Sequence, residues 1–355
     1  MASILISSSE KYSGKSSLCT GIGIILQNKG YSVGYMKPIG NMLVDVNGVL
    51  SDEDAEQMRR VFDLKDDINH ITPILLTDNL AEDALAGVEK HFDRTLTNAF
   101  SEVSKGKDVV LIEGTGGIGG GAMYGLSDPQ VSSILGTKML LVTRYDSVYA
   151  VDRILCDIKL INDPDMLAGV ILNEVDEGQM TYVCELVVPF LEDKGIKVVG
   201  VLPKDSTLRS VPLSEIVEDL HAEVLAGSEH LEELVEHYLV GAMEVNSAIK
   251  YFRRNPGSVV ITGGDRADIQ MAAIEARVKC LVLTGNLQPS GAVLGSADEA
   301  GIPVILVRGD TMSTIGRMES LIGHARFRKE HKLGRMVELI ENNVDVNSLL
   351  SIIGL

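Results

Sequence analysis

Short apolar runs alternate with amphipathic stretches of helical period through the first part of the chain. Continuous apolar runs are typical of strands buried in a parallel sheet. Strands separated by helical segments imply right-handed crossovers and a sheet covered on both faces. We expect strands at 3–7, 31–36, 109–113, 139–143, 168–173 and 198–202, with a helix at 16–27.

A second alternation of strands and helices begins late in the chain. Between the two alternations, apolar residues recur at helical spacing over 213–220, and helical character resumes at 231–243. We expect later strands at 258–262, 280–284 and 303–307, and later helices at 268–275, 290–300, 311–323 and 336–342. The pattern therefore predicts an α/β domain over 1–210, a helical connection over 211–240 and a smaller α/β domain over 241–355.

The sharpest chemical signal is the segment 7–17, which follows the first strand and opens the first helix. Gly14 allows close backbone approach, Lys15 offers a charge to phosphates, and the Ser16 hydroxyl can ligate Mg²⁺. Ser13 and Ser17 complete this candidate phosphate cradle, which is typical of a P-loop NTPase-like fold. A strict motif has Gly where this chain has Ser9, so a capped helix with a solvated Lys is the alternative.

Several polar residues stand where they could complete the same pocket. Glu113 ends a buried strand and precedes a glycine run that includes Gly116, which favours a metal-organising acid beside a ligand. Lys37 ends the second strand, where it could face phosphates or a carboxylate substrate. Asp52 has the position of a helix N-cap, and Asp54 is a candidate metal ligand. Each of these residues also has a purely structural explanation as a cap or a solvated charge.

Composition narrows the classes of partner. The chain has 355 residues, 45% of them apolar, and its 32 Lys and Arg against 50 Asp and Glu give a formal net charge of −18. Such an acidic body disfavours general binding to nucleic acid or to a membrane surface. The chain has 4 scattered cysteines, and we expect a cytoplasmic protein without a signal peptide or membrane span, and a homo-oligomer such as a dimer.

The motifs resemble two known families. Residues 14–16, 34–38, 54–55 and 113–117 resemble the dethiobiotin synthetase-like branch of P-loop proteins. Residues 241–355 resemble the DRTGG domain through Gly264-Asp265-Arg266 and Leu283-Thr284-Gly285, although Asn286 replaces the final Gly. The whole architecture is similar to the non-catalytic N-terminal part of long phosphate acetyltransferases. The chain is therefore not expected to make acetyl phosphate by itself.

The resemblance implies ATP and Mg²⁺ as cofactors. It implies that Lys15 and Lys37 lie at the phosphates and act as the catalytic residues of any reaction. It also implies Ser16, Asp54 and Glu113 around Mg²⁺. Asn173, after an apolar strand, resembles the residue that binds adenine, with a turn residue as the alternative.

In the later domain, three glycine-containing turns follow three expected strands. Asp265, Arg266 and Thr284 are candidate contacts for a regulatory ligand, since the turns stand at strand ends that could share one crevice. A salt bridge is the structural alternative for Arg266. Two hypotheses follow for the whole chain. It is an ATP- and Mg²⁺-binding regulatory or scaffold protein, or an ATP-dependent ligase or carboxylate-activating enzyme of dethiobiotin synthetase type. A purely structural role with a decayed pocket is a third.

Overall fold

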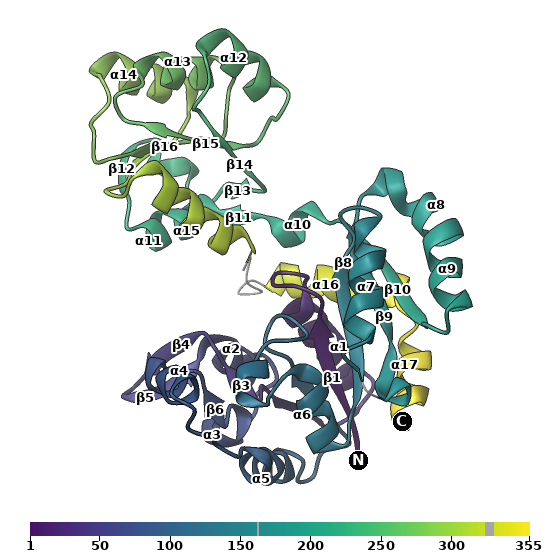
Figure 1. The fold of residues 1–355 in the computed structure, drawn as a ribbon. Helices are drawn as coiled ribbons and strands as arrows, with labels where there is room; N and C mark the ends of the chain where they lie inside the picture. The colour runs from purple at the N-terminus through teal and green to yellow at the C-terminus, as the bar shows by residue number, and fades with distance from the viewer. Residues whose placement is uncertain (162, 324–329) are drawn as a thin grey trace. The chain divides into compact units, whose positions relative to one another are not determined.

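The structure is a computed structural model that describes residues 1–161, 163–323 and 330–355 (Figure 1). It divides into two compact units. Unit 1 comprises Met1–Lys204 together with Lys329–Leu355, and unit 2 comprises Asp205–Arg328. The α/β class expected from the sequence is confirmed, because both units are built on mostly parallel sheets.

Unit 1 contains a 6-stranded sheet in the order β10-β9-β8-β1-β7-β2, with every neighbouring pair parallel. All of the strands expected before residue 204 are present in it. Its strands are β1 Ala2–Ser8, β2 Val33–Met36, β7 Val109–Glu113, β8 Lys138–Arg144, β9 Leu167–Val175 and β10 Val198–Pro203. Four short strands form two further pairs, β3 Ile39–Gly40 with β6 Ile74–Leu75, and β4 Leu43–Val46 with β5 Val49–Asp52.

The helices of unit 1 follow the strands as crossovers. They are α1 Lys15–Asn28, α2 Glu53–Val61, α3 Ile68–Ile71, α4 Asp78–Leu85, α5 Asp93–Val103, α6 Asp128–Leu135, α7 Tyr149–Ile158, α8 Met180–Tyr182 and α9 Val188–Asp193. The connection from β1 to β2 runs toward one edge of the sheet. The later connections, from β2 to β7 and on to β8, β9 and β10, run toward the opposite edge. Right-handed crossovers then put α1 on one face and α6 and α7 on the opposite face. The chain therefore leaves β1 at the switch point where open α/β sheets bind ligands.

The C-terminal segment belongs to unit 1. Helices α16 Glu330–Asn343 and α17 Val346–Ile353 follow unit 2 in sequence, yet Val344 forms a β-bridge with Gly200 at β10. A Cβ on Gly21 of α1 would lie 2.4 Å from Ile340, so this glycine lets α16 pack closely on α1. The expected domain over 241–355 differs from the structure here. Its last helices are bound to the first sheet by contacts between segments far apart in sequence.

Unit 2 contains a 5-stranded sheet in the order β12-β17-β16-β15-β14, parallel except for the antiparallel edge strand β12. Its strands are β12 Glu223–Ala226, β14 Tyr238–Val240, β15 Val259–Gly263, β16 Cys280–Thr284 and β17 Val304–Leu306, with a separate pair β11 Val211–Pro212 and β13 Leu234–Val235. Its helices are α10 Ser206–Arg209, α11 Leu213–Leu220, α12 Val245–Arg253, α13 Ala267–Glu275, α14 Gly291–Ala300 and α15 Thr311–Gly323.

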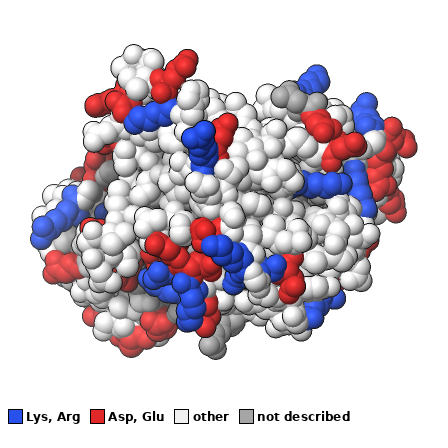
Figure 2. Space-filling view, turned by 90° about the horizontal axis from the view of Figure 1, so that it is seen from below, with Lys and Arg blue, Asp and Glu red and all other residues white. Residues whose placement is uncertain are grey.

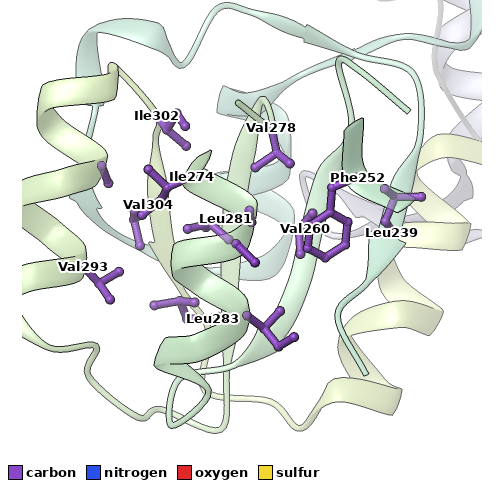
Figure 3. Close-up of a cluster of buried hydrophobic side chains, with 14 of the residues drawn as sticks. Leu239, Phe252, Val260, Ile274, Val278, Leu281, Leu283, Val293, Ile302 and Val304 are labelled. Carbon is purple, nitrogen blue, oxygen red and sulfur yellow. The ribbon is translucent and has the colours of Figure 1, made fainter. Parts of the chain in front are cut away.

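Alternating side chains of this sheet supply two cores. Leu281 and Leu283 of β16 pack with α12, α13 and α14, whereas Cys280 and Val282 pack with α11 and α15. Figure 3 shows the first core, in which Phe252 faces the strands from α12. Successive residues of a strand point to opposite faces, so a continuous apolar run is buried on both.

Two expectations for the segment between the sheets are corrected. The helix at 213–220 is present as α11, but the helix expected at 231–243 is wrong, because that segment forms β13 and β14. These strands pair with β11 and β15, and the pairing outweighs the local helical pattern. The expected connection over 211–240 is thus part of unit 2.

Charged side chains of both signs lie on the surface. On the face drawn in Figure 2, Asp and Glu side chains are interspersed with Lys and Arg, and no continuous basic area covers that face. Within the residues that the structure describes, no helix combines the length and the apolar character needed to cross a bilayer.

Candidate functional site

The loop between β1 and α1 turns at Gly14 and passes close to the side chain of Asn173. Gly14 has φ +86°, and a Cβ there would lie 2.2 Å from Nδ2 of Asn173. That Nδ2 donates to the carbonyl of Ser13 at 2.8 Å, so Asn173 contacts the loop directly. Ser9 is outside the left-handed region, and its hydroxyl hydrogen bonds with that of Thr143 at 2.6 Å. A serine in place of the usual glycine therefore fits this loop without strain.

Glu113 brings together the polar groups at the start of α1. Lys15 Nζ and Ser16 Oγ each donate to Oε1 of Glu113 at 2.6 Å, and Tyr35 OH donates to Oε2 at 2.8 Å. Glu113 and Tyr35 are fully buried, and Lys15 is 7% exposed. Burial, and next the Glu113 charge, raise the pKa of Tyr35 well above its ordinary value, so its hydroxyl stays a donor. The structure thus joins three of the predicted site residues to one another.

Lys37 lies in a second buried ion-pair cluster. Its Nζ is 2.7 Å from Oδ2 of Asp54 and 2.8 Å from Oδ1 of Asp52. Burial lowers the pKa of Lys37, but Asp54 and Asp52 more than offset this effect and raise it. Asp52 caps α2 as expected, accepting from the amides of Asp54 and Ala55. The ammonium group of Lys37 therefore forms ion pairs with two carboxylates and is not exposed to a substrate.

The glycine run after β7 lies against the same loop. Gly116 has φ +108°, and a Cβ there would lie 3.7 Å from Cγ of Lys11. The carbonyl of the preceding residue, Thr115, accepts from Nδ2 of Asn41 at 2.9 Å. Ser17 is half-buried in the first turn of α1. Helix α1 has no acidic residue of its own in that turn, and the carboxylate that its first residues contact is Glu113 of β7.

Asp128, a buried carboxylate at the first position of α6, is not among the residues predicted from the sequence. Ser7 Oγ donates to its Oδ2 at 2.5 Å, and the Thr115 amide donates to Oδ1 at 3.3 Å. A Cβ on Gly114 would lie 2.2 Å from Oδ2, so Asp128 fills the space beneath the glycine run. Burial raises the pKa of Asp128 to about 6. The segment 127–130 has the pattern of a capping box, but that pattern predicts an exposed cap.

The donor set suits a hard cation. Among the described residues, no group of three or more His, Cys, Asp and Glu side chains is gathered for a metal. Mg²⁺ characteristically takes one or two carboxylates together with phosphate oxygens and water. Glu113 Oε1 and Ser16 Oγ are 2.6 Å apart, so both oxygens could face one cation. The predicted ligand Asp54 contacts Lys37 instead of this pair.

In unit 2 the three glycine-containing turns are joined by backbone hydrogen bonds. The Gly264 amide donates to Thr284 O at 3.2 Å, and the Gly285 amide donates to Gly309 O at 2.8 Å. Arg266 forms a salt bridge with Asp268 at 3.0 Å. The hydroxyl of Thr284 hydrogen bonds with that of Thr311 at 2.8 Å.

The turns therefore converge as expected. Asp265, Arg266 and Thr284 remain candidate ligand contacts. The salt-bridge alternative for Arg266 is what the structure contains.

Two family models match the chain. A model described as an AAA domain matches residues 2–211, and a model described as a DRTGG domain matches residues 215–321. A phosphate acetyltransferase of Synechocystis sp. is 25% identical over 99% of this chain and 51% of that protein. One of Nitratidesulfovibrio vulgaris is 26% identical over 98% of this chain and 51% of that protein. The chain spans about half the length of these curated relatives, corresponding to their N-terminal region.

Other similarities cover parts of the chain. An ATP-dependent dethiobiotin synthetase of Caldicellulosiruptor saccharolyticus is 27% identical over 33% of this chain and 49% of that protein. The cell-division protein MinD of Aquifex aeolicus is 17% identical over 59% of this chain and 84% of that chain, with a TM-score of 0.38. The CBS and DRTGG regulatory region of a Clostridium perfringens pyrophosphatase is 20% identical over 44% of this chain and 73% of that chain, with a TM-score of 0.28.

Proposed function

The chain belongs to the AAA-domain family over residues 2–211 and carries a DRTGG domain over 215–321, and from this premise we propose that it is a nucleotide-binding regulatory or scaffold protein. Its ligand in unit 1 is ATP with Mg²⁺. The proposal is supported by the homology with the N-terminal region of phosphate acetyltransferases. Regulation, rather than acetyl transfer, is the role we assign to these two units.

One observation carries the nucleotide site. The cation Lys15 and the hydroxyl of Ser16 meet at a single oxygen of Glu113, at the carboxyl edge of the sheet where the crossovers change direction. An anionic oxygen thus already occupies the position in which this lysine would meet a phosphate. Backbone amides at the start of α1 and the left-handed turn at Gly14 supply the remaining parts of a phosphate cradle.

Each site residue has a proposed role in holding MgATP. Ser13, Gly14, Lys15, Ser16, Ser17 and Gly116 line the phosphates, and Asn173 contacts the adenine from β9. Glu113 and Ser16 hold Mg²⁺, with Asp54 a further ligand once Lys37 turns from it. Bound Mg²⁺ would neutralise phosphate charge. Lys15 would then exchange Glu113 for a phosphate oxygen, while Lys37 keeps Asp52 as its partner.

Unit 2 is proposed as the sensor. Its three joined turns, with Asp265, Arg266 and Thr284, form the candidate contact surface for a regulatory ligand. Arg266 donates to Asp268 through Nε and Nη2, and a guanidinium group recognises anions, so we expect that ligand to be anionic. An oligomer, a dimer in the simplest case, and a cytoplasmic location belong to the same proposal.

Calorimetric titration of MgATP into the full chain tests the proposal. We expect micromolar binding that weakens on the order of ten- to hundredfold in Lys15→Ala, since one charged contact is lost. Lys138→Ala is the matched control, because Lys138 is an exposed lysine at the opposite end of the central strands. No heat with the wild-type protein at millimolar MgATP, together with no thermal stabilisation, would refute the proposal.

A ligase or carboxylate-activating enzyme is the second candidate. The similarity to an ATP-dependent dethiobiotin synthetase favours it. The two carboxylates on Lys37 argue against it, because that ammonium group is not available to a carboxylate substrate. Release of ADP or phosphate that depends on an added small carboxylate or amine would establish the ligase and displace the regulator. ATP binding with no such dependence would support the regulator.

A further inference from the structure

The lysines around the phosphate loop differ in what they already contact. Lys15 is 2.6 Å from Glu113, and Lys37 is within 2.8 Å of two aspartates. Lys11, in the loop itself, has an exposed side chain that forms no salt bridge or hydrogen bond with any residue in the described ranges. An anion arriving at the loop can therefore meet Lys11 without displacing a carboxylate.

The acidic residue next to Lys11 does not neutralise it. Glu10 is paired instead with Arg153 at 2.6 Å and Arg144 at 3.4 Å, which belong to α7 and β8. The stem of Lys11 extends the other way, to within 3.7 Å of the Cβ position of Gly116 in the run after β7. The stem of the Lys11 side chain thus lies on the β7 side of the loop.

The order of the strands indicates which part of a nucleotide would lie on the β7 side of the loop. Asn173 belongs to β9, which lies on one side of β1 in the sheet. Glu113 ends β7 and Lys37 follows β2, and both of these strands lie on the other side of β1. In the proposed site the base lies at Asn173, so the phosphates would extend across the loop toward β7. The last phosphate would then lie near Gly116, beside the stem of Lys11.

We propose that Lys11 is a further phosphate-binding residue, which recognises the terminal phosphate and makes the site prefer a nucleoside triphosphate to a diphosphate. This inference rests on the proposed function of the loop. The contact is a charge-assisted hydrogen bond from an exposed, flexible ammonium group, so its contribution is smaller than that of a buried pair.

Titration of MgATP and MgADP into wild-type protein, Lys11→Met, Lys11→Arg and Lys138→Met tests the inference. We expect Lys11→Met to weaken MgATP about fivefold and MgADP less than about twofold, as an exposed charge contact would. Lys11→Arg should keep most of the preference for MgATP, and Lys138→Met should match the wild type. Lys11 is exposed, so each variant is expected to fold, which thermal unfolding checks.

The outcomes separate this inference from the proposed function. Equal MgATP affinity in Lys11→Met and wild type would overturn the role of Lys11 while leaving the nucleotide site in place. An equal loss for MgATP and MgADP would overturn the assignment to the terminal phosphate. Absence of binding to the wild type would overturn the proposed function, and the role of Lys11 with it.

Discussion

Glu113 is the residue on which the buried cluster of unit 1 depends, and Glu113→Gln is the sharpest test of that cluster. The substitution keeps the shape of the side chain but removes the charge that faces Lys15. Glu113 also accepts from Ser16 and Tyr35, and an amide cannot accept on both of its terminal atoms. The variant therefore loses an ion pair and misplaces one hydrogen bond.

The expected cost follows from burial. Breaking a buried ion pair by removing one partner costs about 3–5 kcal/mol. The side chain of Lys15 is 8% exposed, which lets its ammonium group reach some water and favours the lower end of that range. At about 2–4 °C per kcal/mol for a unit of this size, a loss of about 3 kcal/mol lowers the melting temperature by about 6–12 °C.

Thermal unfolding followed by circular dichroism measures this loss, with Glu177→Gln as the control because Glu177 is exposed. Added pyrophosphate without metal should stabilise Glu113→Gln more than the wild type, since Lys15 no longer has to leave a carboxylate. A melting temperature within about 2 °C of the wild type, or pyrophosphate stabilising both proteins equally, would refute the reasoning.

Two further predictions concern Asp128 and the turn of unit 2. The pKa of Asp128, about 6, lies above that of an exposed aspartate, so protonation of this group favours the folded state. This contribution to the unfolding free energy is fully present below about pH 4 and is lost as the pH rises through 6. The wild type therefore loses about 1.4 kcal/mol of unfolding free energy between pH 5 and pH 8 that Asp128→Asn does not lose, as urea unfolding measures. A difference in unfolding free energy between the two proteins that is the same at both pH values would contradict this. A Cβ on Gly264 would lie 1.8 Å from the Leu287 carbonyl, so Gly264→Ala should destabilise unit 2 by about 2–3 kcal/mol. Gly295→Ala, in open space within a helix, should instead stabilise by about 0.5–1 kcal/mol, and equal effects of the two alanines would argue against the close contact.

The sequence predicts all six strands of the sheet in unit 1 but only the three central and neighbouring strands β15, β16 and β17 of the sheet in unit 2, and it misses β12 and β14. The expected strands 109–113 and 280–284 coincide with β7 and β16, because buried parallel strands are continuous apolar runs between turns. That Lys15 and Glu113 lie close together can also be predicted from the sequence, because the carboxyl ends of parallel strands meet at the same edge of a sheet. Local pattern is sufficient for these features.

Features that depend on distant contacts are beyond the local pattern. Packing of α16 on α1 requires glycine at Gly21, whose role is visible only once Ile340 is beside it. Asp128 has the sequence context of an exposed helix cap, and only the fold shows that it is buried against Ser7. The residues at 231–243 have helical spacing, but their pairing with β11 and β15 makes them strands.

Hydrogen exchange of the full chain with and without MgATP tests the central claim most directly, because it locates the nucleotide as well as detecting it. We predict that MgATP slows amide exchange in residues 9–18 and 113–121, with smaller effects near 173. Slower exchange confined to the turns at 263–268, 284–286 and 308–311 would place the nucleotide in unit 2 instead. That result, or no change anywhere at saturating MgATP, would contradict a nucleotide site at Lys15 and Glu113.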